Sequence, residues 1–255
     1  MIKCDARNVR HFFIDVENYM LEDILKEGFA EMNIACGDAE LERFRIYCDY
    51  LDERNRVMNL TAIRGEEDTA RLHFLDCGAL LKYADFAGAR VIDVGTGAGF
   101  PGLVLKILRP DIRLTLLDSL DKRINFLSET CGKLGFADVE CVHARAEEAP
   151  KEFRESFDIA TSRAVARLSV LGELCLPLVR QGGVFLAMKG PDCAGEVREG
   201  EGAVKLLGGG ITGVEEYTVP GTDVRHAVVR IQKNGVTNAK YPRRWAQIKN
   251  KPLGL

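Results

Sequence analysis

The sequence predicts an α/β protein built on a mostly parallel sheet of seven strands, with an antiparallel strand at the sheet edge and a helical segment in front of it. Three observations predict this fold class. From Arg90 onward, short apolar runs alternate with helical patterns. The early runs are almost continuously apolar, as in a parallel sheet covered on both faces. The last two, GVEEYTV and HAVVRIQ, are joined only by PGTDVR, which implies an antiparallel pair at the sheet edge.

Helical patterns occupy the first part of the chain. A helix is expected over residues 9–29, a second over about 39–58 and, after the break NLTAI, a third over about 66–83. The apolar face of the first holds Phe13, Val16, Met20 and Ile24, and that of the second holds Leu41, Phe44, Cys48 and Leu51. Because two helices bury too little surface to stand alone, we interpret residues 1–60 as a helical cap on a domain formed by residues 61–235.

Seven strands and four further helices are expected in that domain. The strands lie near residues 90–94, 113–118, 138–143, 157–161, 183–188, 213–219 and 226–232. The helices lie near residues 100–109, 121–134, 168–180 and 193–207. Seven strands that end in a reversed hairpin are typical of the Rossmann-like, class I methyltransferases.

A glycine-rich turn follows the first strand, in VIDVGTGAGFPGL (residues 91–103). Gly95, Gly97 and Gly99 come directly after the apolar run, and a helical pattern begins after them. Glycine allows positive φ and lets a ligand approach the backbone, while the helix start offers unpaired N–H groups. The segment therefore predicts a site for a small ligand; the alternative is a glycine-rich turn of the fold that binds nothing.

The identity of that ligand depends on the glycine spacing and on the next strand. A dinucleotide fingerprint needs a glycine at position 100, where this chain has Phe100, so NAD is disfavoured. Asp118 ends the next strand, where a carboxylate can accept both ribose hydroxyls, and Asp93 adds an anion beside the turn. A negative site suits the sulfonium and ammonium groups of S-adenosylmethionine. The turn residues expected to contact this cofactor are Gly95, Thr96, Gly97, Gly99 and Phe100.

The composition is that of an ordinary soluble globular protein, with 46% hydrophobic and 29% charged residues in a chain of 255. No apolar run approaches the length of a membrane span, and the first residues lack the apolar core of a signal peptide. We therefore expect a cytoplasmic protein. The eight cysteines form no CxxC and no zinc-like spacing with histidine, so neither a disulfide nor a metal is expected.

Charge is distributed unevenly along the chain. Residues 1–53 hold thirteen acidic and six basic side chains, whereas residues 224–255 hold eight basic and no acidic ones. The end of the chain, residues 236–255, is therefore interpreted as a basic tail. Either it binds a polyanion or it is a solvated, solubilising end. Tyr241 and Trp245 stand among these charges and favour RNA, because aromatic faces can stack on unpaired bases.

Several motifs together resemble the ribosomal small-subunit RNA guanine-N7 methyltransferases, a family also called glucose-inhibited division protein B. In chain order they are NLTAI, VIDVGTGAGFPGLVLKILRP, LTLLDSLDKRINFL, ARAEE, TSRAVA, AMKG and RHAVVRI. The resemblance covers about residues 40–233. One departure is Cys77, where the family commonly has serine after its H-x-x-D element.

The resemblance implies methyl transfer from S-adenosylmethionine to N7 of one guanine in small-subunit (16S) ribosomal RNA. It implies cofactor contacts at Gly95, Phe100, Ala146, Glu147 and Arg163. It also implies RNA-facing positions at Arg145, Lys189 and Arg225. The expected partner is ribosomal RNA or the small ribosomal subunit, and we expect the chain to be a monomer that binds neither membrane nor metal.

The residues themselves fit this chemistry. Because ligands of such sheets lie beyond the carboxyl ends of the strands, Asp93, Asp118, the residues after His143 and Thr161, and Lys189 should converge on one crevice. Asp93 is placed for the methionine ammonium, directly or through water, and Asp118 for the ribose. Ala146 and Glu147 are placed for the adenine edge. No Asn/Asp-Pro-Pro-aromatic element follows the fourth strand, where the chain reads IATSRAVA, so an exocyclic amine is disfavoured as acceptor.

Guanine N7 has a free lone pair and needs no general base, so positioning can carry catalysis. Arg163 is our first candidate for that role, between cofactor and guanine; the alternative is a surface ion pair. His73 is expected to bond a neighbour such as Asp76, with RNA contact as the alternative. Lys122 and Arg123 stand in the first turn of a helix, where cations are disfavoured, so they face either a phosphate or solvent.

Other functions remain open on the sequence alone. One is a methyltransferase that acts on another RNA, a protein or a small molecule, and a deletion of residues 236–255 would separate it from a ribosomal RNA enzyme. Another is a nucleotide-binding or RNA-binding module without catalysis. A dehydrogenase is disfavoured, because position 100 is Phe100 and no acid or base stands out.

Overall fold

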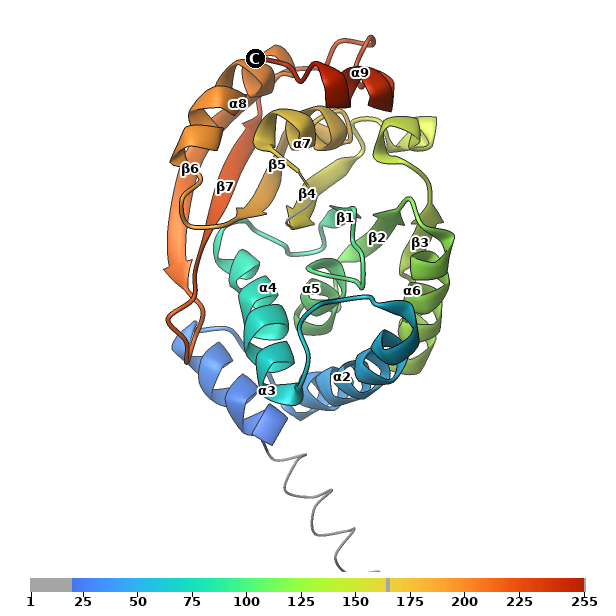
Figure 1. The fold of residues 1–255 in the computed structure, drawn as a ribbon, viewed down its shortest axis with the longest axis vertical. Helices are drawn as coiled ribbons and strands as arrows, with labels where there is room; N and C mark the ends of the chain where they lie inside the picture. The colour runs from blue at the N-terminus through green and yellow to red at the C-terminus, as the bar shows by residue number, and fades with distance from the viewer. Residues whose placement is uncertain (1–19, 164–165, 255) are drawn as a thin grey trace, which may run out of the picture.

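A seven-stranded sheet runs through the centre of the computed structural model, which describes residues 20–163 and 166–254 (Figure 1). The strand order is β3-β2-β1-β4-β5-β7-β6. The strands are β1 (Arg90–Val94), β2 (Arg113–Asp118), β3 (Glu140–His143), β4 (Phe157–Arg163), β5 (Val179–Lys189), β6 (Gly209–Thr218) and β7 (Arg225–Lys233). The first five strands pair with one another in parallel, which confirms the predicted α/β class. β7 is antiparallel to both β5 and β6, so β6 forms the edge beyond the reversed strand.

Strand boundaries follow the apolar runs closely in the first half of the sheet. β1 and β2 have the predicted bounds. β5 begins earlier than predicted, because Val179 already pairs with Phe157 before a register shift brings Val184 opposite Ile159. The helix expected over residues 168–180 therefore ends at Cys175. An apolar run alone does not show where a helix ends and the next strand begins.

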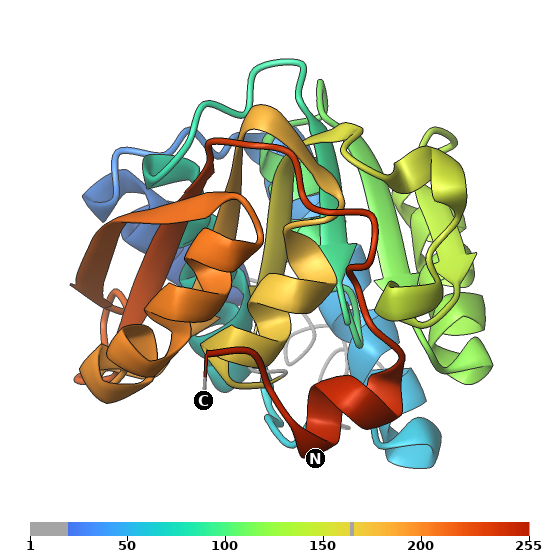
Figure 2. The same cartoon turned by 90° about the horizontal axis from the view of Figure 1, so that it is seen from above.

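Helices cover both faces of the sheet. The α-helices are α2 (Asp38–Met58), α3 (Glu66–Thr69), α4 (Asp76–Gly78), α5 (Gly102–Leu108), α6 (Asp121–Leu134), α7 (Leu168–Cys175), α8 (Ala194–Leu206) and α9 (Trp245–Asn250). The short segments of other helix types are η1 (Ala70–Leu75), η2 (Ala79–Lys82), η3 (Ala146–Glu148) and η4 (Lys151–Phe153). Alternate residues of β1 belong to different cores: Val91 lies in the cluster that contains residues of α2, α5 and α6, and Ile92 in the cluster that contains residues of α7 and α8. Figure 2 shows α7 and α8 on the near side of the strands.

The amino-terminal helices pack directly on the sheet domain. Residues 20–31 are helical, and the predicted face residues Phe13 and Val16 lie outside the described residues. Met20 is 45% exposed, whereas Ile24 is buried. The buried face continues through Phe29 and joins the same core cluster as Phe44 of α2 and Leu103 of α5. The cap and the sheet therefore share one hydrophobic core.

The third predicted helix is a continuous helical segment that changes type along its length. It begins as α3, widens to the π-helical η1 and ends in α4 and the 3₁₀ segment η2. π-helical turns are rare and are found frequently at functional sites. This one carries Leu72 and His73, both of which contact Arg163 of β4.

The carboxyl-terminal segment was expected to be a basic tail, and it packs against the domain instead. Tyr241 is only 5% exposed and Ile248 of α9 is fully buried in the core with α7. The prediction that Tyr241 stacks on RNA is therefore wrong. Arg243 forms an ion pair with the fully buried Glu173 of α7, with 2.7 Å between Nη2 and Oε2. A count of charges along the sequence does not show this, because the carboxylate that neutralises Arg243 lies about 70 residues away, on α7.

Three further observations concern the described part of the chain. No helix in it is long and apolar enough to span a membrane. No group of three or more His, Cys, Asp or Glu side chains in it could hold a metal ion. The cysteines it contains, from Cys36 to Cys193, are all free thiols.

Candidate functional site

A cavity of about 870 Å³ opens at the carboxyl ends of the parallel strands. Its volume is in the range of small-molecule and cofactor sites. Residues that line it and follow or end the strands are Val94, Asp118, Ala144, Arg163 and Lys189. Further lining residues are Leu60, Thr61, Ile63, Leu72, His73, Asp76, Ser119, Arg123, Leu174, Met188, Val224, His226 and Trp245. The five strand ends therefore meet at one crevice, with Val94 at the end of β1 in place of the predicted Asp93.

The glycine turn forms one wall of this cavity. Gly95, Thr96, Gly97 and Phe100 line it. The backbone N–H of Gly97 donates to Asp118 Oδ2 at 2.9 Å. Gly99 does not line the cavity: its φ is +101°, and a Cβ there would lie 2.7 Å from the Tyr47 hydroxyl. Gly97 has φ +63° with open space around a Cβ. Gly99 thus serves packing, whereas the other turn residues are placed for a ligand.

Asp118 stands at the end of β2, in the cavity wall. Its Oδ1 accepts the Leu120 N–H at 3.0 Å, and its Oδ2 faces Arg123 at 3.2 Å. The ion pair accounts for Arg123 in the first turn of α6, because the cation compensates a buried carboxylate rather than meeting solvent. Lys122 beside it is exposed. Asp118 is 3% exposed, and its carboxylate is held in place by Gly97, Leu120 and Arg123.

Asp93 lies behind the cavity wall rather than in it. The residue is fully buried, and its carboxylate accepts the Gly102 N–H at 2.9 Å and the Thr161 hydroxyl at 3.2 Å. Burial raises its pKa to about 6. Its position at the strand end predicts contact with the methionine ammonium, directly or through water. Asp93 does not line the cavity, and its carboxylate binds the start of α5 and Thr161, so contact through water is the part of this expectation that stays a prediction.

At the β3 end of the sheet, the cavity wall contains a buried carboxylate oxygen without a hydrogen-bond partner among the described residues. Ala146 and Glu147, in η3, line this end. Glu147 Oε1 is buried and finds no hydrogen-bond partner among the described residues; Arg145 Nη1 is 4.0 Å away. A buried acceptor of this kind needs a donor. The exocyclic amine of an adenine supplies one, so the residues present fit the adenosyl group of S-adenosylmethionine.

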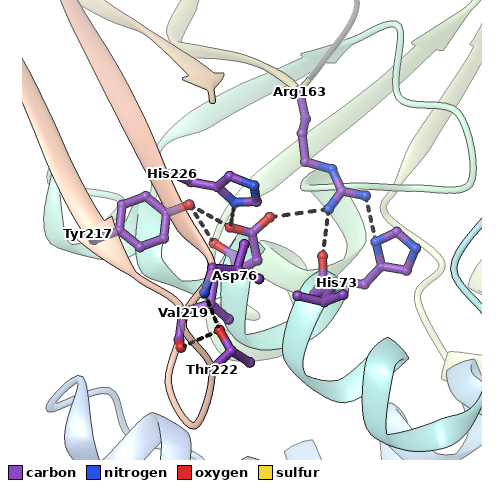
Figure 3. Close-up of polar contacts among 9 residues, drawn as sticks. His73, Asp76, Arg163, Tyr217, Val219, Thr222 and His226 are labelled. Atoms are coloured by element: carbon purple, nitrogen blue, oxygen red, sulfur yellow. Dashed lines mark hydrogen bonds and ion pairs between the residues drawn. The ribbon is translucent and has the colours of Figure 1, made fainter. Parts of the chain in front are cut away.

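Arg163, the last residue of β4, lines the cavity on a strand that β2 and β1 separate from β3, and it is held by several contacts (Figure 3). Its Nη1 donates to the Leu72 carbonyl at 3.1 Å, and its Nη2 lies 2.7 Å from His73 Nδ1. The guanidinium carbon is 4.9 Å from the centre of the Phe100 ring, a cation–π distance. Arg163 is therefore a fixed cation above the glycine turn rather than a surface ion pair.

His73 serves this arrangement differently from the prediction. We expect it to bond a neighbour such as Asp76; the neighbours it bonds are Thr61, whose hydroxyl lies 2.9 Å from Nε2, and Arg163, and its ring stacks on Phe100 at 4.1 Å between centroids. Both ring nitrogens are thus engaged. Burial, together with the neighbouring Arg163 charge, lowers the pKa of His73 to about 2, so the ring is neutral.

Asp76 binds partners from three other elements (Figure 3). It is 1% exposed, and its Oδ1 accepts from the Tyr217 hydroxyl at 2.6 Å and from His226 Nδ1 at 2.7 Å. Its Oδ2 faces Arg163 Nη1 at 3.4 Å. The hydrogen bond to Asp76 raises the pKa of His226. Sequence reasoning assigned no role to His226 or Tyr217, because about 150 residues separate them from Asp76 and only the sheet order brings them together.

The three cations expected to face RNA lie in different surroundings. Lys189 Nζ is paired with Glu196 at 2.6 Å and its side chain is only 7% exposed. Arg145 lines the cavity and is 54% exposed. Arg225 pairs with Glu216 on the surface and lies outside the cavity wall, next to the lining residues Val224 and His226. Of this set, Arg145 is the cation that the cavity leaves most open to a polyanion.

Comparisons with known proteins agree with this geometry. Residues 40–222 match the model of the family described as rRNA small subunit methyltransferase G. A ribosomal RNA small subunit methyltransferase G from Clostridium perfringens is 44% identical over 234 residues, which cover 91% of this chain and 98% of that protein. The protein of the same name from Alkaliphilus oremlandii is 46% identical over 237 residues, covering 91% and 99% of the two chains.

Two solved structures share the fold at low sequence identity. TrmN from Thermus thermophilus aligns with TM-score 0.50 and 21% identity, over 62% of this chain and 48% of that one. The 16S rRNA (adenine(1408)-N(1))-methyltransferase of Catenulisporales acidiphilia aligns with TM-score 0.50 and 15% identity, over 60% and 88% of the two chains. These likenesses support the class I methyltransferase fold. The match to the family model and to its full-length relatives goes further, and it shows that this chain belongs to the rRNA small subunit methyltransferase G family.

Proposed function

We propose that this chain transfers the methyl group of S-adenosylmethionine to N7 of a guanine in small-subunit (16S) ribosomal RNA, as a cytoplasmic monomer. The observation that carries the proposal is that one cavity holds both a set of residues suited to the cofactor and a fixed cation suited to the base. One end offers Asp118 and the unpartnered Glu147 oxygen, and the other holds Arg163 over Phe100. Family membership supports the reaction and the RNA substrate.

Cofactor binding is assigned to the wall between the glycine turn and η3. Asp118 accepts hydrogen bonds from the ribose hydroxyls, and Glu147 accepts one from the adenine amine through Oε1, which has no hydrogen-bond partner among the described residues. The bare backbone of Gly95 and Gly97 allows the cofactor to lie against the turn. When bound there, S-adenosylmethionine supplies a methyl carbon on a sulfonium, ready for attack by a lone pair.

The part of the cavity around Arg163, His73 and Asp76, called the acceptor end because it would receive the base to be methylated, suits guanine N7, which needs no deprotonation. Both ring nitrogens of His73 are engaged, and the Asp76 carboxylate already accepts from Tyr217 and His226. Because the side chains that could accept a proton are already hydrogen-bonded, the site is suited to a nucleophile that has a free lone pair and needs no deprotonation. What the protein contributes is orientation, which can lower a barrier by up to about 7–11 kcal/mol when reacting atoms are well aligned.

Arg163 is assigned the orienting role between cofactor and guanine. Its contacts with Leu72, His73 and Asp76 fix the guanidinium without removing it from the cavity wall. A fixed cation at this place attracts acceptor atoms such as guanine O6. Because the same contacts keep the guanidinium from moving, Arg163 binds a guanine only when the base lies in the orientation needed for transfer.

The test is methyl transfer by Arg163→Ala, with Arg167→Ala as the matched control. Arg167 pairs with Glu199 on the surface, and its side chain is 67% exposed. We expect Arg163→Ala to lower kcat/KM by about 100-fold or more, because small misplacements of reacting groups have effects of that size, while Arg167→Ala stays within about twofold. Activity of Arg163→Ala near the wild-type level, in a protein that unfolds cooperatively, would remove Arg163 from the mechanism.

The alternative substrates need a different test from the one that the sequence suggested. Deleting residues 236–255 would remove Tyr241 and Ile248 from the core and leave Glu173 without Arg243. Loss of activity would then report damage to the fold. Replacing Arg145 with alanine avoids this problem, because its side chain is exposed at the cavity. An RNA enzyme should lose RNA affinity, and an enzyme for a small molecule should be little affected.

A further inference from the structure

Trp245, the only tryptophan in the chain, lines the cavity from the carboxyl-terminal segment. It begins α9, which packs against α7, and α7 also packs against η3, where Glu147 lies. Leu174 of α7 lines the same cavity. The indole is 38% exposed. An aromatic ring therefore lines the cavity on a helix that packs against α7, and α7 also packs against the segment that holds Glu147.

The position of Trp245 is fixed from both sides along the chain. Two residues before it, Arg243 binds the buried Glu173 through two nitrogens, with 2.8 Å from Nε to Oε1 and 2.7 Å from Nη2 to Oε2. Three residues after it, Ile248 is fully buried. Glu173 immediately precedes Leu174 of the cavity wall. The ion pair and the buried isoleucine therefore anchor the indole to the same helix that supplies part of the cavity wall.

We propose that Trp245 is a cofactor-binding residue whose indole packs on the adenosyl group of S-adenosylmethionine, so that the carboxyl-terminal segment closes the adenine end of the cavity. The inference rests on the proposed function, which assigns this end to adenine. Glu147 recognises the edge of the base, and a flat apolar ring is suited to its face. RNA stacking, which the sequence suggested for Trp245, becomes the competing outcome.

Indole fluorescence tests the proposal directly, because all tryptophan emission of the chain comes from this position. Titrating the wild-type protein with S-adenosylhomocysteine should change the emission saturably. The midpoint should equal the Kd from isothermal titration calorimetry. Trp245→Ala should weaken S-adenosylhomocysteine binding by about tenfold, since stacking of an aromatic side chain on a base has an effect of that order. Trp245→Phe should keep most of the affinity.

Lys249→Ala is the matched control, because Lys249 lies on the same helix, is exposed and does not line the cavity. Its affinity should equal that of the wild type. The proposal is overturned if S-adenosylhomocysteine binds the wild type without changing the emission and Trp245→Ala binds it equally well. It is also overturned if Trp245→Ala loses only RNA affinity. If calorimetry detects no binding to the wild type, the proposed function itself fails.

Discussion

Asp76 offers the sharpest test of how the acceptor end of the cavity is held together. Its carboxylate is 1% exposed and binds Tyr217 and His226 through one oxygen and Arg163 through the other. Asp76→Asn keeps the shape and removes the charge. One oxygen becomes an amide NH₂, which then faces either the Arg163 guanidinium or the Tyr217 and His226 donors. Removing one partner of a buried ion pair lowers stability by about 3–5 kcal/mol.

We expect about 3 kcal/mol for Asp76→Asn at about pH 6, the lower end of that range, because His226 is 31% exposed and Arg163 stands at 3.4 Å. The effect should depend on pH. The folded-state pKa of His226 is raised above its ordinary value of 6.5, so the stabilisation by its protonated ring is fully present below that value. It is lost as the pH rises through the folded pKa. The difference between variant and wild type should therefore shrink toward about pH 9.

Urea unfolding at the two pH values measures these differences. Tyr217→Phe is the matched control: it removes one neutral donor from the Asp76 carboxylate and leaves the charges in place. It should lower stability by about 1 kcal/mol with little pH dependence. The reasoning is refuted if Asp76→Asn unfolds within about 0.5 kcal/mol of the wild type, which is the range of ordinary surface substitutions. A loss that is equal at both pH values refutes the role given to His226.

Two further substitutions test the carboxyl-terminal segment and the glycine turn. Arg243→Ala leaves the buried Glu173 without its cation, with only the backbone N–H of residue 243, and should lower stability by about 3 kcal/mol in urea, whereas the exposed Arg244→Ala should change it by less than about 0.5 kcal/mol; equal effects would contradict the anchoring role of Arg243. Gly99→Ala forces φ +101° on a residue with a Cβ 2.7 Å from the Tyr47 hydroxyl, and thermal unfolding should show a loss of about 1–3 kcal/mol, well above that of Gly97→Ala. Similar losses at the two glycines would refute the steric argument.

The sequence predicts the sheet well where each strand is an apolar run with a polar end. Val91 to Val94 and Leu114 to Leu117 are such runs, and the structure pairs them in parallel. It predicts α9 poorly, because only Trp245 and Ile248 mark a helix among charged residues. Two apolar side chains are too few to show a helical period, and their burial depends on α7.

The residues of the site likewise include some that the sequence predicts and some that it does not. Residues next to the glycine turn and at strand ends could be placed in advance, because parallel strands end at one edge of the sheet. Asp76, Tyr217 and His226 could not, since no local pattern links positions so distant in the chain. One signal was present: Asp76 is a carboxylate within an apolar helical stretch, and a charge buried there needs partners. The sequence did not show that those partners come from β6 and β7.

The central claim is that this chain methylates N7 of a guanine in small-subunit ribosomal RNA. The most direct measurement is incubation of the pure protein with methyl-labelled S-adenosylmethionine and small-subunit RNA or particles that lack the modification, followed by mass analysis of the nucleosides. The account predicts labelled 7-methylguanosine with the wild type and a loss of about 100-fold in its rate of formation with Arg163→Ala. Label in another nucleoside, or no labelled RNA from a protein that binds S-adenosylhomocysteine, would contradict it.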